Sequence, residues 1–316
     1  MITNTSDYLI NYWDLLESAI IDRNRVNIDN ICKYGIPMLD NYLGWILPSE
    51  LVVIWADPWV GKSEIAYLIA IENAMRWKKI LLLSLEWDLQ EIALRHLQRE
   101  INKFATIKTA DYRFNLTDLT DIEYQAFERI SDKVKNNLLI YNKKQIPDLI
   151  FVKNLIEATK DNIDMIIIDH LHYIQIEWEN ENRVIWEIMR ELKTITDIIK
   201  KPIILMSHLR KRDTKQDPEI YDLYWSSNVS KEATTILLVS RMNHSLENWI
   251  PWVNEDDKRY SKTKISVRKS RIWLPLSNFE TLFDRYKKEY ISWNLIKEQS
   301  MATEDDNLHN LIKRWI

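Results

Sequence analysis

The residues with the clearest chemical role lie between positions 51 and 63. Leu51–Ile54 is an apolar run typical of a buried strand, and a run with helical periodicity follows Ser63. This strand–loop–helix context favours a phosphate-binding loop, with Ala in place of the usual first Gly, over a chance Gly-Lys-Ser sequence. The loop reads Ala56, Asp57, Pro58, Trp59, Val60, Gly61, Lys62 and Ser63.

The end of this loop suits the binding of phosphate groups. Backbone N–H groups in the loop and at the start of the helix attract anions. The Lys62 ammonium is expected to reach the β- and γ-phosphates, and the Ser63 hydroxyl to bind Mg²⁺. The sequence therefore predicts a nucleotide bound together with Mg²⁺.

Two carboxylates follow predicted strands. Glu86 lies at the end of Ile80–Leu85, and Asp169 follows Asp164–Ile168. Because ligands of open α/β sheets bind beyond the carboxyl ends of the strands, both side chains are expected to face the nucleotide. Glu86 suits a base that orients and deprotonates water, and Asp169 suits a carboxylate on the Mg²⁺ side. The alternative for Glu86 is a solvated side chain at a strand end.

Three histidines accompany these strands. His208 follows Pro202–Ser207 and could sense the terminal phosphate through a hydrogen bond, with a purely structural histidine as the alternative. His170 and His172 invite a metal site, but no further cluster of ligands supports one.

These residues need a scaffold, and the rest of the sequence predicts it. Strands alternating with helices indicate an α/β fold with a mostly parallel central sheet and a C-terminal β-hairpin. We expect a helix and linker at 1–34, one large domain at 35–285 and a charged tail at 286–316. Further predicted strands are 138–141, 234–241, 262–269 and 276–284, and predicted helices are 6–22, 88–104, 120–133, 148–160 and 181–200.

Composition narrows the class of protein. The chain has 316 residues and a formal net charge of −4, so a nucleic-acid surface must be local. It has no apolar run long enough to span a membrane and no signal-peptide pattern, and Cys32 is its single cysteine. We therefore expect a cytoplasmic protein without disulfides, structural zinc or a membrane partner.

Glycine and tryptophan occur in unusual numbers. The chain has 3 Gly and 14 Trp, whereas Gly usually makes up about 7% of residues. Some genetic codes read UGA as glycine and others as tryptophan, so we hypothesise that many of these Trp stand for Gly in the natural protein. An unusually Trp-rich family is the alternative, and UGG codons at these positions would reject the hypothesis. The positions concerned are Trp45, Trp55, Trp59, Trp77, Trp186, Trp225 and Trp273.

Taken together, the motifs resemble the ATPase domain of the DnaB-type replicative helicases, within the RecA-like superfamily of P-loop NTPases. The resemblance covers about 34–285 and includes Gly35–Asp40, Ser84–Glu86, Ile167–Leu171, Leu205–Leu209 and Lys269–Trp273. It implies ATP and Mg²⁺ as cofactors, with Glu86 as catalytic base and Asp169 as the Walker B acid. His208 lies where many of these helicases have Gln. Lys269 and Arg271 match a pair that enters the neighbouring subunit's ATP site.

The resemblance also implies partners. It predicts a homo-hexamer that translocates on single-stranded DNA, with DNA contacts on the loops after Asp169 and His208, which face the ring centre in this fold. A solvated basic loop is the alternative interpretation. Because only about 34 residues precede the core, we expect no N-terminal primase-binding domain, and the sequence identifies no primase or loader. The basic side chains are Arg210, Lys211, Arg212 and Lys215.

Two other functions fit the same motifs. A RadA-like or clock-type ATPase would remodel DNA joints or proteins without processive unwinding, and strand displacement that depends on DNA length separates it from a helicase. Trp59, taken literally, would plug the phosphate loop and leave a scaffold without activity. ATP turnover would exclude the scaffold.

Overall fold

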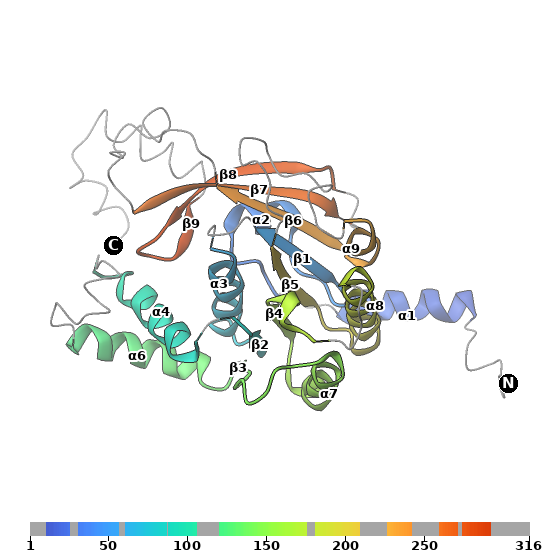
Figure 1. Ribbon diagram of the computed structural model, residues 1–316, viewed down its shortest axis with the longest axis horizontal. Helices are drawn as coiled ribbons and strands as arrows, with labels where there is room; N and C mark the ends of the chain where they lie inside the picture. Colours follow the sequence, from blue (N-terminus) through green and yellow to red (C-terminus); the bar gives the residue numbers. More distant parts are fainter. Residues whose placement is uncertain are drawn as a thin grey trace.

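The computed structural model describes residues 11–25, 31–56, 61–86, 88–105, 120–175, 181–208, 226–241, 259–270 and 274–291. These residues form a 9-stranded sheet in the order β3-β2-β4-β5-β1-β6-β7-β8-β9 (Figure 1). The parallel strands are β1 (Leu51–Ala56), β2 (Ile80–Ser84), β3 (Leu138–Ile140), β4 (Met165–Asp169), β5 (Ile203–His208) and β6 (Thr235–Arg241). The antiparallel strands are β7 (Tyr260–Ser270), β8 (Ser277–Asp284) and β9 (Glu289–Ile291). The predicted α/β fold with a mostly parallel sheet and a C-terminal hairpin is confirmed.

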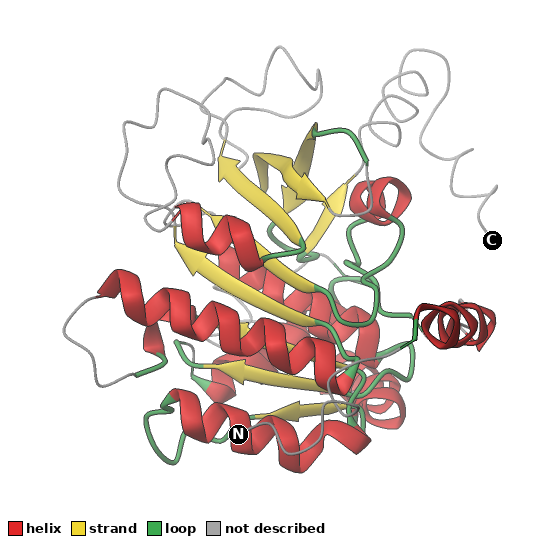
Figure 2. Ribbon diagram, turned by 90° about the vertical axis from the view of Figure 1, so that its right-hand side faces the viewer, coloured by secondary structure: helices red, strands yellow, loops and turns green. Residues whose placement is uncertain are grey.

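Helices connect the strands and lie along them (Figure 2). Their bounds are α1 (Tyr12–Arg25), α2 (Pro37–Leu43), α3 (Lys62–Ala74), α4 (Leu89–Ile101), α6 (Thr120–Val134), α7 (Leu149–Thr159), α8 (Glu181–Ile199) and α9 (Ser226–Glu232). Two short 3-10 helices are η3 (Lys160–Asn162) and η4 (Leu171–Tyr173). Among the described helices, none has both the length and the apolar character needed to cross a membrane.

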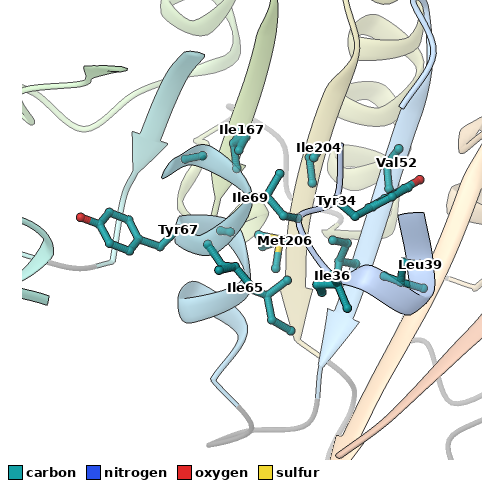
Figure 3. Close-up of a cluster of buried hydrophobic side chains, with 14 of the residues drawn as sticks. Tyr34, Ile36, Leu39, Val52, Ile65, Tyr67, Ile69, Ile167, Ile204 and Met206 are labelled. Atoms are coloured by element: carbon teal, nitrogen blue, oxygen red, sulfur yellow. The ribbon is translucent and has the colours of Figure 1, made fainter. Parts of the chain in front are cut away.

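The central strands are buried on both faces because helices cover each side. In β1, Val52, Ile54 and Ala56 belong to the same apolar cluster as residues of α2 and α3 (Figure 3). The alternating residues Leu51, Val53 and Trp55 point to the other face and belong to a second cluster with residues of α7, α8 and α9. A strand covered on both faces needs a continuous apolar run, which is why β1, β2 and β4 were recognisable in the sequence.

Some boundaries differ from the sequence predictions. Helices α2 and α9 were not predicted, since each has only 7 residues, too few to show a helical period. Strand β9 lies in the stretch predicted as a charged tail, where it pairs with β8 and buries Tyr290. Helix α1 extends to Arg25, beyond the predicted end at residue 22, and residues 1–10 lie outside the described part.

Helix α1 projects away from the sheet (Figure 1). Its apolar side chains are exposed to solvent, with Tyr12 at 73% and Trp13 at 70% of their full area. Leu15, Leu16, Ile20 and Ile21 are exposed as well. Exposed apolar side chains on one short helix favour a partner surface outside this chain.

The backbone conformation differs among the tryptophans for which we hypothesise glycine in the natural protein. Trp77 has φ 65, in the left-handed region that favours glycine, and its side chain is 62% exposed. Trp45, Trp55 and Trp186 are not among the described residues with positive φ, so their backbone conformation does not call for glycine. Residues 59, 225 and 273 lie outside the described part.

Candidate nucleotide site

The candidate site lies between the end of β1 and the start of α3. Gly61 is the N-cap of α3 and has φ 91, a conformation that side chains rarely adopt. Helix α3 starts at Lys62, so Lys62 and Ser63 stand in its first turn, where backbone N–H groups are free of helical partners. Ala56 ends β1, and the predicted loop residues Asp57, Pro58, Trp59 and Val60 lie outside the described part.

Three of the predicted residues, Glu86, Asp169 and His208, come together around Lys62. The Lys62 Nζ atom lies 3.7 Å from Glu86 Oε2 and 3.9 Å from Asp169 Oδ1. It also lies 3.3 Å from His208 Nε2. These neighbours come from three strands, and β4 and β5 lie between β2 and β1 in the sheet. The cluster forms because parallel strands place their carboxyl ends at one edge.

Charge and burial shape the chemistry of Lys62. Its side chain is 4% exposed, and burial lowers the pKa of its ammonium, while Asp169 and Glu86 act in the opposite direction. A lysine that is buried beside two carboxylates holds its charge through them. An anionic ligand at the start of α3 would offer the ammonium a further partner.

Asp169 is the buried carboxylate of the site. Burial raises its pKa, and the Lys62 ammonium and a hydrogen bond from Ser63 lower it. The Asp169 Oδ1 atom is buried and accepts no hydrogen bond within the described residues. A cavity of about 10 Å³ lies beside Ser63, Ser84 and Asp169, which is room for about one water. A hydroxyl and an unsatisfied carboxylate oxygen are the oxygen ligands that Mg²⁺ prefers.

The three histidines form one row of contacts. The rings of His208 and His170 lie 4.2 Å apart between centroids, and His170 Nδ1 lies 3.1 Å from His172 Nδ1. Burial is the main cause that lowers the pKa of His208, and the charge of Lys62 adds to it. The same two causes lower the pKa of His170 to about 2. Because an ammonium only donates, the neutral His208 ring accepts at Nε2 and carries its proton on Nδ1. Among the described residues no group of three or more His, Cys, Asp and Glu side chains is placed to hold a metal ion.

Lys269 lies near the amino end of β6, two strands away from β1. It pairs with Ile236 of β6, and Ile236 pairs with Val53 of β1. Ala56 is three residues further along β1, about 10 Å away at 3.3 Å per residue. Strand β7 continues away from Ala56 to Ser270, and the Lys269 ammonium donates to the Ser230 and Lys231 carbonyls.

The Lys269 ammonium therefore lies against α9 and not beside the carboxyl ends of the parallel strands, where the Lys62 cluster lies. Arg271, two residues beyond Lys269, lies outside the described part. The predicted DNA-contacting residues Arg210, Lys211, Arg212 and Lys215 also lie outside it.

A phosphate-binding loop between a parallel strand and a helix, with carboxylates on neighbouring strand ends, defines the class of P-loop nucleotide-binding α/β proteins. The chain belongs to the family described as the DnaB-like helicase C terminal domain, whose family model matches residues 32–290.

Curated relatives agree with this family. The replicative DNA helicase DnaB of Haemophilus influenzae is 26% identical over 257 residues, which are 76% of this chain and 53% of that protein. The DnaB of Geobacillus stearothermophilus is 24% identical over 85% of this chain and 57% of its own length. The chain thus spans about half the length of the curated relatives that it matches.

Solved structures share the fold. A structure of a DnaB-like replicative helicase and its interactions with primase matches with a TM-score of 0.70 at 19% identity, over 90% of this chain and 68% of that one. An isolated ATPase domain matches with a TM-score of 0.67 at 18% identity, over 92% of this chain and 99% of that one.

Proposed function

We propose that the chain is an ATP-dependent DNA helicase motor that couples ATP hydrolysis to movement along single-stranded DNA. The observation that carries the proposal is the convergence of Glu86, Asp169 and His208 on Lys62 at the start of α3. Membership of the DnaB-like family and the curated relatives named replicative DNA helicase support the helicase over the RadA-like or clock-type alternative.

Each side chain of the cluster has a defined task in this proposal. The Lys62 ammonium and the first N–H groups of α3 bind the phosphates. Glu86, whose side chain is 37% exposed, is open to water and can orient a water molecule and take its proton. His208 presents a neutral ring next to Lys62 and can follow the displacement of the ammonium when phosphate binds.

The same residues fit a metal ion. Ser63 Oγ and Asp169 Oδ1 are the atoms that would hold Mg²⁺, which neutralises charge on the phosphates when it is bound. Asp169 is fixed for this task because β4 is buried between β2 and β5. The proton on the attacking water therefore goes to Glu86, the more exposed of the two carboxylates.

The proposal includes a ring of identical subunits, which we expect to be a hexamer. Lys269 lies near the amino end of β6 and its ammonium contacts α9, so we expect Lys269 and Arg271 to act on the site of a neighbouring subunit. A guanidinium supplied in this way stabilises charge that grows on the transferring phosphate. DNA would run along the loops that follow β4 and β5, including the basic residues 210–215.

ATP turnover tests this proposal directly. Glu86→Gln should lower the rate by about 10²–10⁴-fold and leave ATP binding in place, because the amide keeps the shape and cannot take a proton. Glu157→Gln, at a side chain that is 64% exposed on α7, is the matched control and should leave the rate unchanged. Equal turnover by the parent and Glu86→Gln would contradict the assignment.

A further inference from the structure

A second cavity, of about 600 Å³, lies beside the nucleotide site. Its walls come from the segments that follow β2, β3 and β4, so it opens at the same edge of the sheet as the Lys62 cluster. It shares no lining residue with that cluster. The side chains that matter for its chemistry are Lys143, Lys144, Gln145, His172, Tyr173 and Gln175.

Backbone and side-chain contacts hold these walls in place. The Tyr141 hydroxyl donates to the Gln145 carbonyl at 2.8 Å. The Gln175 N–H donates to the Pro147 carbonyl at 3.0 Å, and the Gln175 carbonyl accepts from Leu149 N–H at 3.3 Å. The segment after β3 is thereby tied to the segment after β4. A preformed cavity of this kind is the usual setting for a ligand.

The lining groups suit one nucleotide unit of a single strand. Lys143 and Lys144 are consecutive and supply two ammonium groups, which attract phosphate. Tyr173 is 47% exposed and offers a ring face on which a base can stack. The amides of Gln145 and Gln175 can donate and accept, which fits the edge of a base.

The cavity is in physical contact with the nucleotide site. His172 lines it and lies 3.1 Å from His170, whose ring lies 4.2 Å from that of His208. His208 in turn lies 3.3 Å from the Lys62 ammonium. Tyr173 also contacts His170, with 5.8 Å between ring centroids. A ligand against His172 and Tyr173 therefore touches a row of side chains that ends at the P-loop lysine.

We propose that this cavity binds a phosphate and base of single-stranded DNA, and that the row His172, His170 and His208 connects its occupancy to Lys62. The inference rests on the proposed helicase function and adds the segment after β3, with Lys143 and Lys144, to the DNA contacts expected after β4 and β5. Single-stranded rather than duplex DNA fits, because stacking on Tyr173 requires an unpaired base face.

The test measures binding of a labelled oligothymidylate by fluorescence anisotropy at several salt concentrations. Lys143→Ala with Lys144→Ala removes two phosphate contacts, so the slope of log affinity against log salt should fall by about 1.4. At 0.1 M salt this corresponds to an affinity about 25-fold lower. Lys133→Ala with Lys135→Ala is the matched control. These two lysines are exposed and lie just before β3, whereas Lys143 and Lys144 lie just after it. The control pair should change affinity by less than about twofold.

A second variant tests stacking without a change in charge. Tyr173→Leu should lower affinity about 5–150-fold, and Tyr173→Phe, which keeps the ring, should retain it. Unchanged slope and affinity in the lysine and Tyr173→Leu variants, with a parent that binds DNA and turns over ATP, would overturn the cavity assignment alone. A parent that neither binds DNA nor hydrolyses ATP would overturn the proposed function. Variants that lose subunit assembly but bind DNA with parental slope would also overturn the inference.

Discussion

Substitution of Trp77 by Gly should stabilise the protein. Helix α3 ends in a Schellman motif, in which Lys78 N–H donates to the Asn73 carbonyl and Trp77 N–H to the Ala74 carbonyl, each at 3.0 Å. Trp77 takes the left-handed position of this motif, with φ 65. Helices that end in this way usually carry Gly at that position, because it has no Cβ to clash.

The size of the effect follows from this conformation. A residue with a Cβ costs about 1–2 kcal/mol in the left-handed region. The Trp77 ring is 62% exposed, so its removal gives up little buried area. Glycine adds conformational entropy to the unfolded chain, which offsets part of the gain. Trp77→Gly should therefore raise the free energy of unfolding by about 1 kcal/mol.

Urea unfolding measures this difference, with the midpoint shifting and the slope unchanged. Trp77→Ala is the matched control: it removes the ring and keeps the Cβ, so it should bring no gain. Equal stability of the Gly and Ala variants would refute the reasoning. Trp55→Gly should act in the opposite direction, because Trp55 is 1% exposed in β1 and its loss leaves a cavity that costs at least about 3–5 kcal/mol.

Three further predictions concern assembly, catalysis and pH. A mixture of Arg271→Ala and Lys62→Ala subunits should hydrolyse ATP faster than either variant alone, because an intact arginine can serve a neighbour's intact phosphate loop; a mixture no faster than its parents would contradict action between subunits. Deletion of residues 1–30 should shift the proposed oligomer toward monomer in analytical ultracentrifugation, since α1 exposes its apolar side chains; an unchanged sedimentation profile would reject this role. Burial, with smaller effects from Arg99 and Lys103, lowers the pKa of His96 to about 3, so the free energy of unfolding should fall as pH drops below about 6.5.

The sign of the His96 effect can be checked with one substitution. Below pH 6.5 the unfolded chain takes up a proton that the folded state, with its pKa of about 3, does not. The loss is about 1.4 kcal/mol per pH unit between these two values. His96→Leu removes this contribution, so its stability between pH 6.5 and pH 5 should fall by about 2 kcal/mol less than that of the parent. Parallel pH profiles of parent and variant would exclude His96 as the source.

Much of the fold could be predicted because the central strands carry the information locally. Met165–Asp169 is a buried apolar run that ends in a carboxylate. The sequence therefore predicts both the strand and the position of Asp169 at its carboxyl end. The approach of Glu86 and His208 to Lys62 followed from the rule on strand carboxyl ends. Helices α2 and α9 and strand β9 were missed because each is short and depends on tertiary packing.

Other parts of the site depend on contacts between distant segments. The cavity beside Lys143 and Tyr173 forms only when the segments after β3 and β4 meet, and no single stretch indicates it. The sequence suggests only a metal site for His170 and His172, whereas in the structure His170 contacts His208 and His172 contacts His170. The position of Lys269 beside the amino end of β6 depends on the antiparallel register of β6 and β7.

The most direct test of the central proposal is ATP-dependent strand displacement on a forked DNA duplex of increasing length. The parent chain should displace the strand only with ATP and Mg²⁺, and Glu86→Gln should bind the same DNA without displacing it. Displacement that persists in long duplexes would mark a translocating helicase. ATP hydrolysis without strand displacement at any duplex length would contradict the helicase proposal and favour a remodelling ATPase.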